Sequence, residues 1–161
     1  MGQDREYRDA LGQFPTGVAI VSTVYRETAL AMTINSFSSV SLDPRLVLWS
    51  VDHGSNRYEV FRDAQHFAIS ILAANQGEIA RQCAQFAELS KTNVQWTPSA
   101  HRVPLISEAL VHFECESHAV HTAGDHDVII GEVIRFDRPK HSPALMFHQS
   151  EFSTTPSVEV R

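Results

Sequence analysis

The side chains best suited to hold a ligand are concentrated between residues 31 and 44, which read AMTINSFSSVSLDP. Five hydroxyls and one amide fall within this segment. A turn with a purely structural role needs only about two or three such groups. We therefore interpret the segment as a loop for a ligand with a phosphate at one end and a flat heteroaromatic ring at the other. A Ser/Thr-rich turn that binds nothing is the alternative that composition leaves open.

A second candidate for phosphate binding is the start of a predicted helix at Ser55, Asn56 and Arg57. The first N–H groups of a helix have no partner within it and attract phosphate. Simple capping by Ser55 and Asn56 is the alternative. Arg81 could also reach a phosphate, although a solvated arginine on a helix face would have the same sequence pattern.

Side chains able to bind a metal recur at every second position of one predicted strand. They are His112, Glu114, Glu116 and His118. Residues two apart share a face of a strand, so these four side chains could form a His/Glu metal site. Their alternation with Val111, Phe113 and Cys115 is explained more simply by a solvent-facing side, and neighbours on a flat strand splay apart. We predict no metal site.

Bulk composition limits the function classes. A chain of 161 residues is long enough for one domain with its own core. The net charge of −6 and the lack of a basic cluster argue against a nucleic-acid partner. No apolar run approaches the ~20 residues of a membrane span, and the first residues carry no apolar signal segment. Cys83 and Cys115 lack metal or redox spacing, so we predict buried free thiols in a cytoplasmic protein.

The first half of the chain predicts short helices and strands in alternation. Residues 4–12 have helical spacing of apolar side chains, and strands are expected over 17–23 and 29–34. Residues 46–51 are apolar without alternation, which predicts a strand buried on both faces. Asn56-x-x-Glu59 and Asn75-x-x-Glu78 have the spacing of capping boxes, each before a helix. In the second helix, an inward stripe is expected from Ile79, Cys83 and Phe86.

The remaining predicted elements are mostly strands. They cover residues 66–72, the alternating segment from 111 to 118, 128–136 and 144–147. Residues 88–107 are interpreted as a long ordered loop. About six hairpin-linked strands with two or three short helices indicate a small barrel and not repeated βαβ units.

Five segments, in the same order along the chain, resemble the flavin reductase-like family. Residues 31–44 are similar to its signature Gly-Met-Thr-x-Asn-Ser-Phe-x-Ser-Val-Ser-Leu-x-Pro-Pro, and 14–18 to its opening x-Thr-Gly-Val strand. Residues 46–51 and 66–72 are similar to its second and third buried strands. The stretch 124–133 is similar to its Gly-Asp-His strand. The resemblance implies a single domain over 1–161 with the FMN-binding split-barrel fold, a mainly β, antiparallel, Greek-key-like barrel flanked by short helices.

The resemblance also implies a reaction. In that family NADH or NADPH reduces FMN or FAD, a homodimer forms, and reduced flavin passes to an oxygenase component or another acceptor. The cofactors carry the reactivity, while the protein stacks the rings and supplies hydrogen bonds. The lack of a nucleophile, triad or carboxylate pair in this sequence is therefore expected.

Carried over residue by residue, the resemblance implies a set of flavin contacts. They are Pro15, Thr16, Thr33, Ile34, Asn35, Ser36, Ser38, Ser39, Ser50, Val51, Asp52, Ser55, Asn56, Arg57, Arg81 and Phe147. His126, the histidine of the Gly-Asp-His motif, is the implied catalytic residue beside the nicotinamide, where it could bind the carboxamide or help to exchange a proton. Without the family context, a histidine that begins a strand is more often incidental.

The sequence departs from the family pattern at three places. Ala31 replaces the usual glycine before Met-Thr, which could restrict the approach of the backbone to the ligand. Arg45 replaces the second proline of the Asp-Pro-Pro turn. Residues 147–152 read FHQSEF where the family tends to show Tyr-His-Arg-Gly-x-Tyr. The missing arginine leaves the choice between NADH and NADPH open.

Two other functions remain compatible with the same residues. A flavin-binding electron carrier would use the flavin loop without nicotinamide turnover. An oxidase or oxygenase on the same barrel would use bound flavin on an organic substrate. Retention of flavin without oxidation of NADH would favour these two over a reductase.

Overall fold

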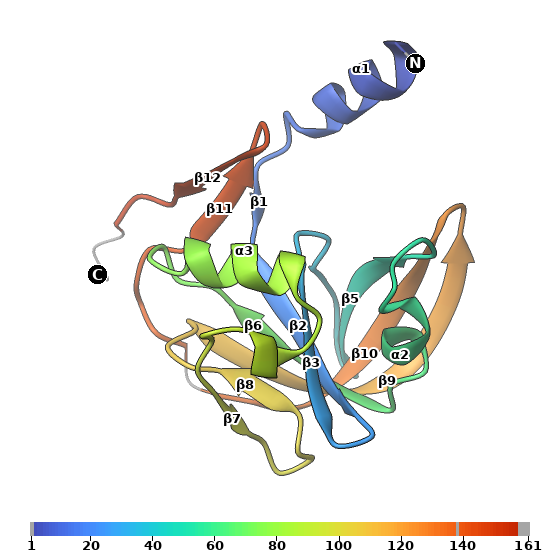
Figure 1. Cartoon of the computed structure of the whole chain (residues 1–161), viewed down its shortest axis with the longest axis vertical. Helices are drawn as coiled ribbons and strands as arrows, with labels where there is room; N and C mark the ends of the chain where they lie inside the picture. Colours follow the sequence, from blue (N-terminus) through green and yellow to red (C-terminus); the bar gives the residue numbers. More distant parts are fainter. Residues whose placement is uncertain (1, 138, 158–161) are drawn as a thin grey trace.

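The computed structural model describes residues 2–137 and 139–157. The helices and strands in chain order are α1 (Gly2–Leu11), β1 (Thr16–Gly17), β2 (Ala19–Tyr25), β3 (Thr28–Ile34), β4 (Ser38–Leu42), β5 (Arg45–Asp52), α2 (Tyr58–Arg62), β6 (His66–Ile71), α3 (Gly77–Gln85), η1 (Leu89–Lys91), β7 (Trp96–Pro98), β8 (Pro104–Ile106), β9 (Val111–Ala123), β10 (His126–Phe136), β11 (Leu145–His148) and β12 (Glu151–Thr154). The chain is mainly β, as predicted (Figure 1).

A seven-stranded sheet forms the body of the protein, in the order β3-β2-β6-β9-β10-β5-β4. All its pairs are antiparallel. Its two outermost strands, β3 and β4, are nevertheless neighbours in the chain, joined only by residues 35–37. Four steps of about 3.8 Å lead from the Cα atom of Ile34, at the end of β3, to that of Ser38, at the start of β4. These two strand ends therefore lie at most about 15 Å apart. The sheet must therefore curl until its edges nearly meet, which confirms the predicted split barrel and puts the split at the Ser/Thr-rich segment.

Two smaller sheets lie beside the barrel (Figure 1). One has the order β1-β11-β12 and joins the two ends of the chain, with Thr16 opposite Phe147. The other pairs β7 with β8. The prediction of a long loop over residues 88–107 is therefore wrong, because these residues contain η1 and the β7–β8 hairpin.

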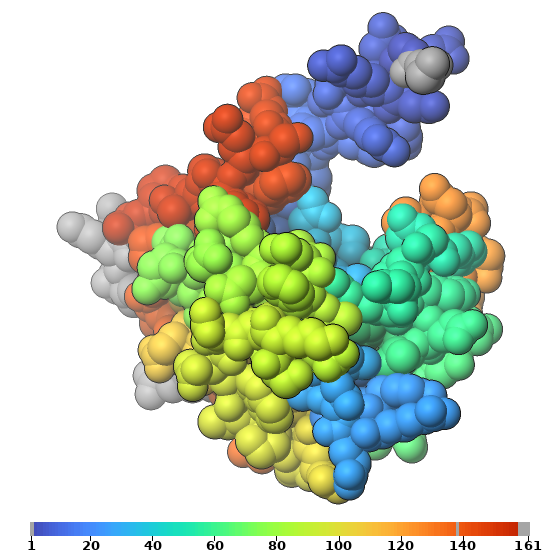
Figure 2. All heavy atoms as spheres, viewed as in Figure 1, coloured from blue at the N-terminus to red at the C-terminus, as the bar shows by residue number. Residues whose placement is uncertain are grey.

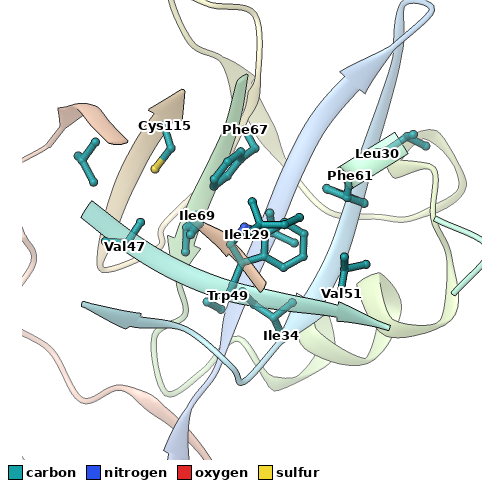
Figure 3. Packing of buried hydrophobic residues seen from close by; sticks show 13 residues of the cluster. Leu30, Ile34, Val47, Trp49, Val51, Phe61, Phe67, Ile69, Cys115 and Ile129 are labelled. Atoms are coloured by element: carbon teal, nitrogen blue, oxygen red, sulfur yellow. The ribbon is translucent and has the colours of Figure 1, made fainter. Parts of the chain in front are cut away.

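The main core is built around Trp49, which Figure 3 shows among side chains from several strands. Its ring packs edge-on against Phe61 at 5.7 Å and Phe67 at 5.9 Å between centroids. The prediction that residues 46–51 are buried on both faces is wrong. Val47, Trp49 and Val51 are buried, while the residues between them are only half-buried. Such alternation is typical of an antiparallel strand with one face toward the core.

A second cluster packs α3 against the sheet. Its members include Ile20, Ala31, Leu72, Ala80 and Cys83. Both cysteines are free and buried, as predicted. In the predicted inward stripe, Cys83 is buried, Ile79 is half-buried, and Phe86 lies just beyond the helix and is exposed.

Neither predicted capping box forms. Arg57 and Gln76 occupy the N-cap positions, and neither makes a side-chain cap hydrogen bond. The Gln76 amide instead accepts from the Ala73 N–H at 2.9 Å and donates to the Ser107 carbonyl at 2.8 Å. Ser55 Oγ accepts from the Arg57 N–H at 3.2 Å. Of these hydrogen bonds only the one between Gln76 and Ser107 joins residues distant in the chain, and local spacing cannot reveal it.

Strand β9 departs from simple alternation. It runs to Ala123, beyond the predicted end, and Glu114 is buried, not solvent-facing. Its Oε1 lies 2.5 Å from Ser99 Oγ and 2.7 Å from His101 Nδ1. His112 Nδ1 lies 2.5 Å from Asp137 Oδ2. Glu114 and His112 therefore have hydrogen-bond partners outside the set His112, Glu114, Glu116 and His118.

Helix α1 projects from the body beside β1 and buries none of its residues (Figure 1). Tyr7, Leu11 and the following Phe14 are 66%, 58% and 76% exposed. None of the described helices is long and apolar enough to cross a membrane.

Candidate functional site

A polar hollow of about 210 Å³ opens at the split of the barrel. It is lined by Met32, Thr33, Ile34, Asn35, Ser36, Ser50, Asp52, Ser55 and His126. In Figure 2 the surface is deeply notched between the N-terminal helix and the lobe that contains α2 and the tip of the β9–β10 hairpin. The lining residues lie in β3, β5 and β10 or shortly after β3 and β5, and they are up to about ninety residues apart in the chain. The curled sheet brings these three strands together.

Short hydrogen bonds fix the walls of the polar hollow. Ser36 Oγ accepts from the Ser50 N–H at 3.0 Å, which ties the loop after β3 to β5. Asp52 Oδ1 accepts from the Gly54 N–H at 2.7 Å and shapes the turn after β5. These side chains are oriented before any ligand arrives, a condition for precise binding.

His126 begins β10 directly after the hairpin turn, where Gly124 has a φ of +68°. A positive φ is readily adopted by glycine, which explains why the turn uses it. His126 Nδ1 lies 2.7 Å from Asp125 Oδ1, and this hydrogen bond lowers the pKa of Asp125 below its ordinary value. With Nδ1–H donated to the carboxylate, Nε2 is the nitrogen available to a ligand.

An apolar hollow of about 300 Å³ adjoins the polar one, sharing Thr33, Ile34 and Asn35 with it. Its other lining residues are Val18, Ala80, Arg81, Ala84, Phe147 and Phe152. Thr33 Oγ1 donates to the Ala80 carbonyl at 2.6 Å, so it joins β3 to α3 at the shared rim.

Aromatic side chains and one cation close the apolar hollow. Phe147 and Phe152 pack edge to face at 5.7 Å, and the Arg81 guanidinium lies 5.2 Å from the Phe152 ring. Arg81 also lies 3.6 Å from Glu78 in an exposed pair. The site therefore combines an apolar compartment, a cation and a polar compartment.

One buried polar atom next to this region has no partner among the described residues. Thr16 Oγ1 is buried and unpaired, and Thr16 lies opposite Phe147 in the β1–β11 pair. A buried hydroxyl without a hydrogen bond costs free energy, so it is usually kept where a ligand or water can satisfy it. The donor set of hydroxyls, amide and imidazole beside apolar walls fits a flavin, whose ring is flat and apolar and whose chain is polar.

The structure does not bring every expected contact to the two hollows. Ser38 and Ser39 lie exposed on β4, at the edge of the sheet, and Val51 is in the main core. Pro15 and Asn56 line neither hollow. Ala31 is fully buried, its N–H bonded to the Ala87 carbonyl, so it does not restrict a ligand.

Arg57 is a structural brace. Its guanidinium donates to the carbonyls of Ala31, Cys83 and Ala84 at 3.2, 2.8 and 3.2 Å. The expectation that Arg57 faces a phosphate has no support in this geometry, because β3 and α3 already use both terminal nitrogens.

Sequence reasoning missed several residues that line the hollows: Val18, Met32, Ala80, Ala84 and Phe152. The spacing of Ala80 and Ala84 places two small side chains on one helix face. That pattern could have indicated a space over α3, but it also occurs where helices simply pack closely.

Comparison with known proteins agrees with this geometry. The sequence model of the protein family described as the flavin reductase like domain matches residues 11–156 of this chain. FMN reductase (NADH) SmoA of Agrobacterium fabrum is 44% identical over 133 residues, 81% of this chain and 75% of the relative. The reductase component of the flavin-dependent trigonelline monooxygenase of Acinetobacter baylyi is 43% identical over 133 residues. The match covers 82% of this chain but only 43% of that relative.

Solved structures have the same fold. NADH:FAD oxidoreductase SgcE6 of Streptomyces globisporus C-1027, solved with NAD and FAD fragments, has a TM-score of 0.90 and 34% identity, over 97% of this chain and 95% of that one. BorF, the flavin reductase component of a bacterial two-component tryptophan halogenase, has a TM-score of 0.87 and 31% identity, over 95% and 98%. From the family match over residues 11–156 and these relatives, we conclude that the chain belongs to the flavin reductase-like family.

Proposed function

We propose that this chain is an NAD(P)H-dependent flavin reductase, which transfers hydride from nicotinamide to FMN or FAD, and that residues 1–161 form one such domain. The observation that carries the proposal is the junction of a polar and an apolar hollow at Thr33, Ile34 and Asn35. The relatives named above as NADH-dependent reductases of FMN and FAD support it.

The size of the hollows supports an extended ligand. Ligand sites usually measure about 300–1,000 Å³. At about 210 and 300 Å³, each hollow falls at or below the lower end of that range. A flavin nucleotide would thus have to use both, crossing the shared rim.

The residues of the site have separable tasks in this proposal. Bound flavin would accept the hydride, and the protein would orient the two rings. Ser36 and Asp52 hold the walls of the polar hollow through backbone N–H groups, and Thr33 fixes the rim through the Ala80 carbonyl. His126, oriented by Asp125, would present Nε2 to the carboxamide of the nicotinamide or to a proton exchanged with solvent.

The test is oxidation of NADH and NADPH, followed at 340 nm with FMN, FAD or no flavin, in wild type and His126→Ala. We expect flavin-dependent turnover that falls about 10- to 100-fold in the variant. Unchanged turnover in His126→Ala would assign the nicotinamide side to other residues. Flavin binding without nucleotide oxidation would reject the reductase in favour of an electron carrier or an oxidase.

We further propose that two copies of the chain associate and that an oxygenase component takes up the reduced flavin. Support for a homodimer comes from the apolar side chains of Tyr7, Leu11 and Phe14, which are exposed on and after α1. Sedimentation of wild type and Leu11→Glu tests this: a dimeric wild type and a monomeric variant are expected. A monomeric wild type at micromolar concentration would reject the homodimer.

A further inference from the structure

A buried carboxylate lies directly behind the candidate catalytic histidine. Asp127 follows His126 in β10, and successive side chains of a strand point to opposite faces. His126 lines the polar hollow, whereas the Asp127 residue is 1% exposed. The proposed reaction does not use this carboxylate. Burial of a carboxylate without partners costs free energy, so its partners need an explanation.

Three donors from outside the β9–β10 hairpin satisfy the Asp127 carboxylate, and the Thr122 side chain of β9 adds a further hydrogen bond. Tyr58 Oη donates to Oδ2 at 2.7 Å, His53 Nε2 lies 2.8 Å from Oδ1, and Arg62 Nε lies 3.3 Å from Oδ2. The hydrogen bonds from Tyr58 and then His53 hold the pKa of Asp127 well below its usual range, although burial opposes them. The carboxylate is therefore ionised at neutral pH and attracts all three donors.

The three donors come from one short segment, the turn after β5 and helix α2. The same turn supplies Asp52 and Ser55 to the polar hollow. His53 adds a second link, because its backbone N–H donates to the Asp125 carbonyl at 2.9 Å. Its ring also packs edge-on against Tyr58, at 4.9 Å between centroids. The network thus ties the turn after β5 and helix α2 to β10 at the polar hollow, next to the paired strand ends where Asp52 lies opposite His126.

The β5–β10 ladder, in which His126 pairs with Asp52, already fixes where these two strands end. Residues 122–125 are exposed, and the tip of the β9–β10 hairpin projects beside α2 in Figure 1. The ladder stops at Asp52, so it does not hold the residues that follow in the chain. The bonds to Asp127 and the His53–Asp125 backbone bond hold these following residues, at 53–55 and in α2, against β10.

We propose that Asp127, with His53 and Tyr58, is a positioning residue that holds the turn after β5, and with it Ser55, at a fixed separation from His126. The inference rests on the proposed function, because it assigns the polar hollow to the ligands. It adds three residues, none of which lines the hollow, to the machinery of the site.

The test is a double-mutant cycle with a matched control. kcat and KM are measured for Asp127→Asn in the wild-type and the His126→Ala backgrounds. We expect Asp127→Asn to lower kcat/KM for NADH about tenfold when His126 is present and less than about twofold when it is absent, since coupled residues are not additive. Equal losses in both backgrounds would overturn the proposal and reduce Asp127 to a structural role.

The control is Glu114→Gln. Glu114 is also buried, also in the β9–β10 hairpin and also held by a hydroxyl and a histidine, but it lies outside the two hollows. It should lose thermal stability as Asp127→Asn does while keeping kcat/KM within about twofold. A comparable kinetic loss in Glu114→Gln would mean that destabilisation alone explains Asp127→Asn.

Two further measurements keep the outcome decisive. Tyr58→Phe removes one donor and leaves the charge of Asp127, so it replaces Asp127→Asn if that variant does not fold. We expect Tyr58→Phe to lower kcat/KM about threefold, and only when His126 is present. If the wild type binds FMN but oxidises no nucleotide, the reductase proposal fails. The positioning role is then decided by the dissociation constant for FMN, which must rise in Asp127→Asn and stay unchanged in Glu114→Gln.

Discussion

Nη1 of Arg57 lies 2.8 Å from the carbonyl oxygen of Cys83. The same guanidinium bonds the carbonyls of Ala31 and Ala84, so a single side chain joins β3 to the end of α3. Arg57 is 8% exposed, and burial lowers its pKa below the ordinary value. Because β3 and α3 both line the apolar hollow, Arg57 supports the site from behind.

Replacement of this brace should cost stability more than ligand affinity. Arg57→Met leaves three carbonyls without their donor, and hydrogen bonds to charged groups contribute about 1.5–3 kcal/mol each. We expect the free energy of unfolding in urea to fall by about 3 kcal/mol. Arg81→Met, on the exposed face of α3, should change it by less than about 0.5 kcal/mol. If Arg57→Met instead weakened the binding of FMN but not that of riboflavin, which lacks the phosphate, Arg57 would be a phosphate contact and not only a structural residue.

Gly131 should not tolerate even a methyl group. A Cβ at this position would lie 2.5 Å from Phe67 Cζ and 3.0 Å from Cys115 Cβ, at an irregularity of the β9–β10 register. Gly131→Ala should therefore lower the free energy of unfolding by about 1–3 kcal/mol through overpacking. Gly17→Ala is the control, because its added Cβ meets nothing within 4 Å. Equal unfolding midpoints for the two variants would show that the core yields at Phe67.

Both thiols should be inert in the folded protein. Burial raises the pKa of Cys83 to about 11 and that of Cys115 to about 12. Since the thiolate is the nucleophile, a disulfide reagent at pH 8 should label neither cysteine in buffer and both in concentrated urea. Rapid labelling of one thiol without denaturant would reveal local opening of the core.

The acid limb of stability should depend on Glu114. Burial opposes ionisation of this carboxyl, but hydrogen bonds from Ser99 and His101 outweigh it and lower the pKa of Glu114 below its ordinary value. A carboxyl whose pKa is depressed in the folded state stabilises the protein above its unfolded pKa, about 4.3, and loses this contribution as the pH falls through the folded value.

Glu114→Gln removes that titration. Between about pH 5 and pH 3, the free energy of unfolding should fall less steeply in the variant than in the wild type. Glu116→Gln, on an exposed position of the same strand, should retain the wild-type slope. Identical slopes for wild type and Glu114→Gln would show that other carboxylates, such as Asp127 and Asp137, account for the acid limb.

Strands were predictable where the sequence pattern is local. The apolar run 66–72 became β6, and the segment 111–118 lies within β9, although the burial of Glu114 breaks the expected alternation. The helix caps were not predictable. Gln76 bonds to Ser107, which is distant in the chain, and this contact replaces the capping box expected at Asn75.

The sequence by itself determined the family, through five ordered segments, and it pointed to the segment 31–44, part of which lines the candidate site. Tertiary structure decided which hydroxyls of that segment face the hollow. Ser36 lies at the split and bonds to Ser50, whereas Ser38 and Ser39 enter the edge strand β4 and are exposed. Likewise, Tyr58 and Asp127 are 69 residues apart in sequence yet 2.7 Å apart in space. Such contacts depend on the register and curvature of the sheet, which long-range packing sets and no local pattern encodes.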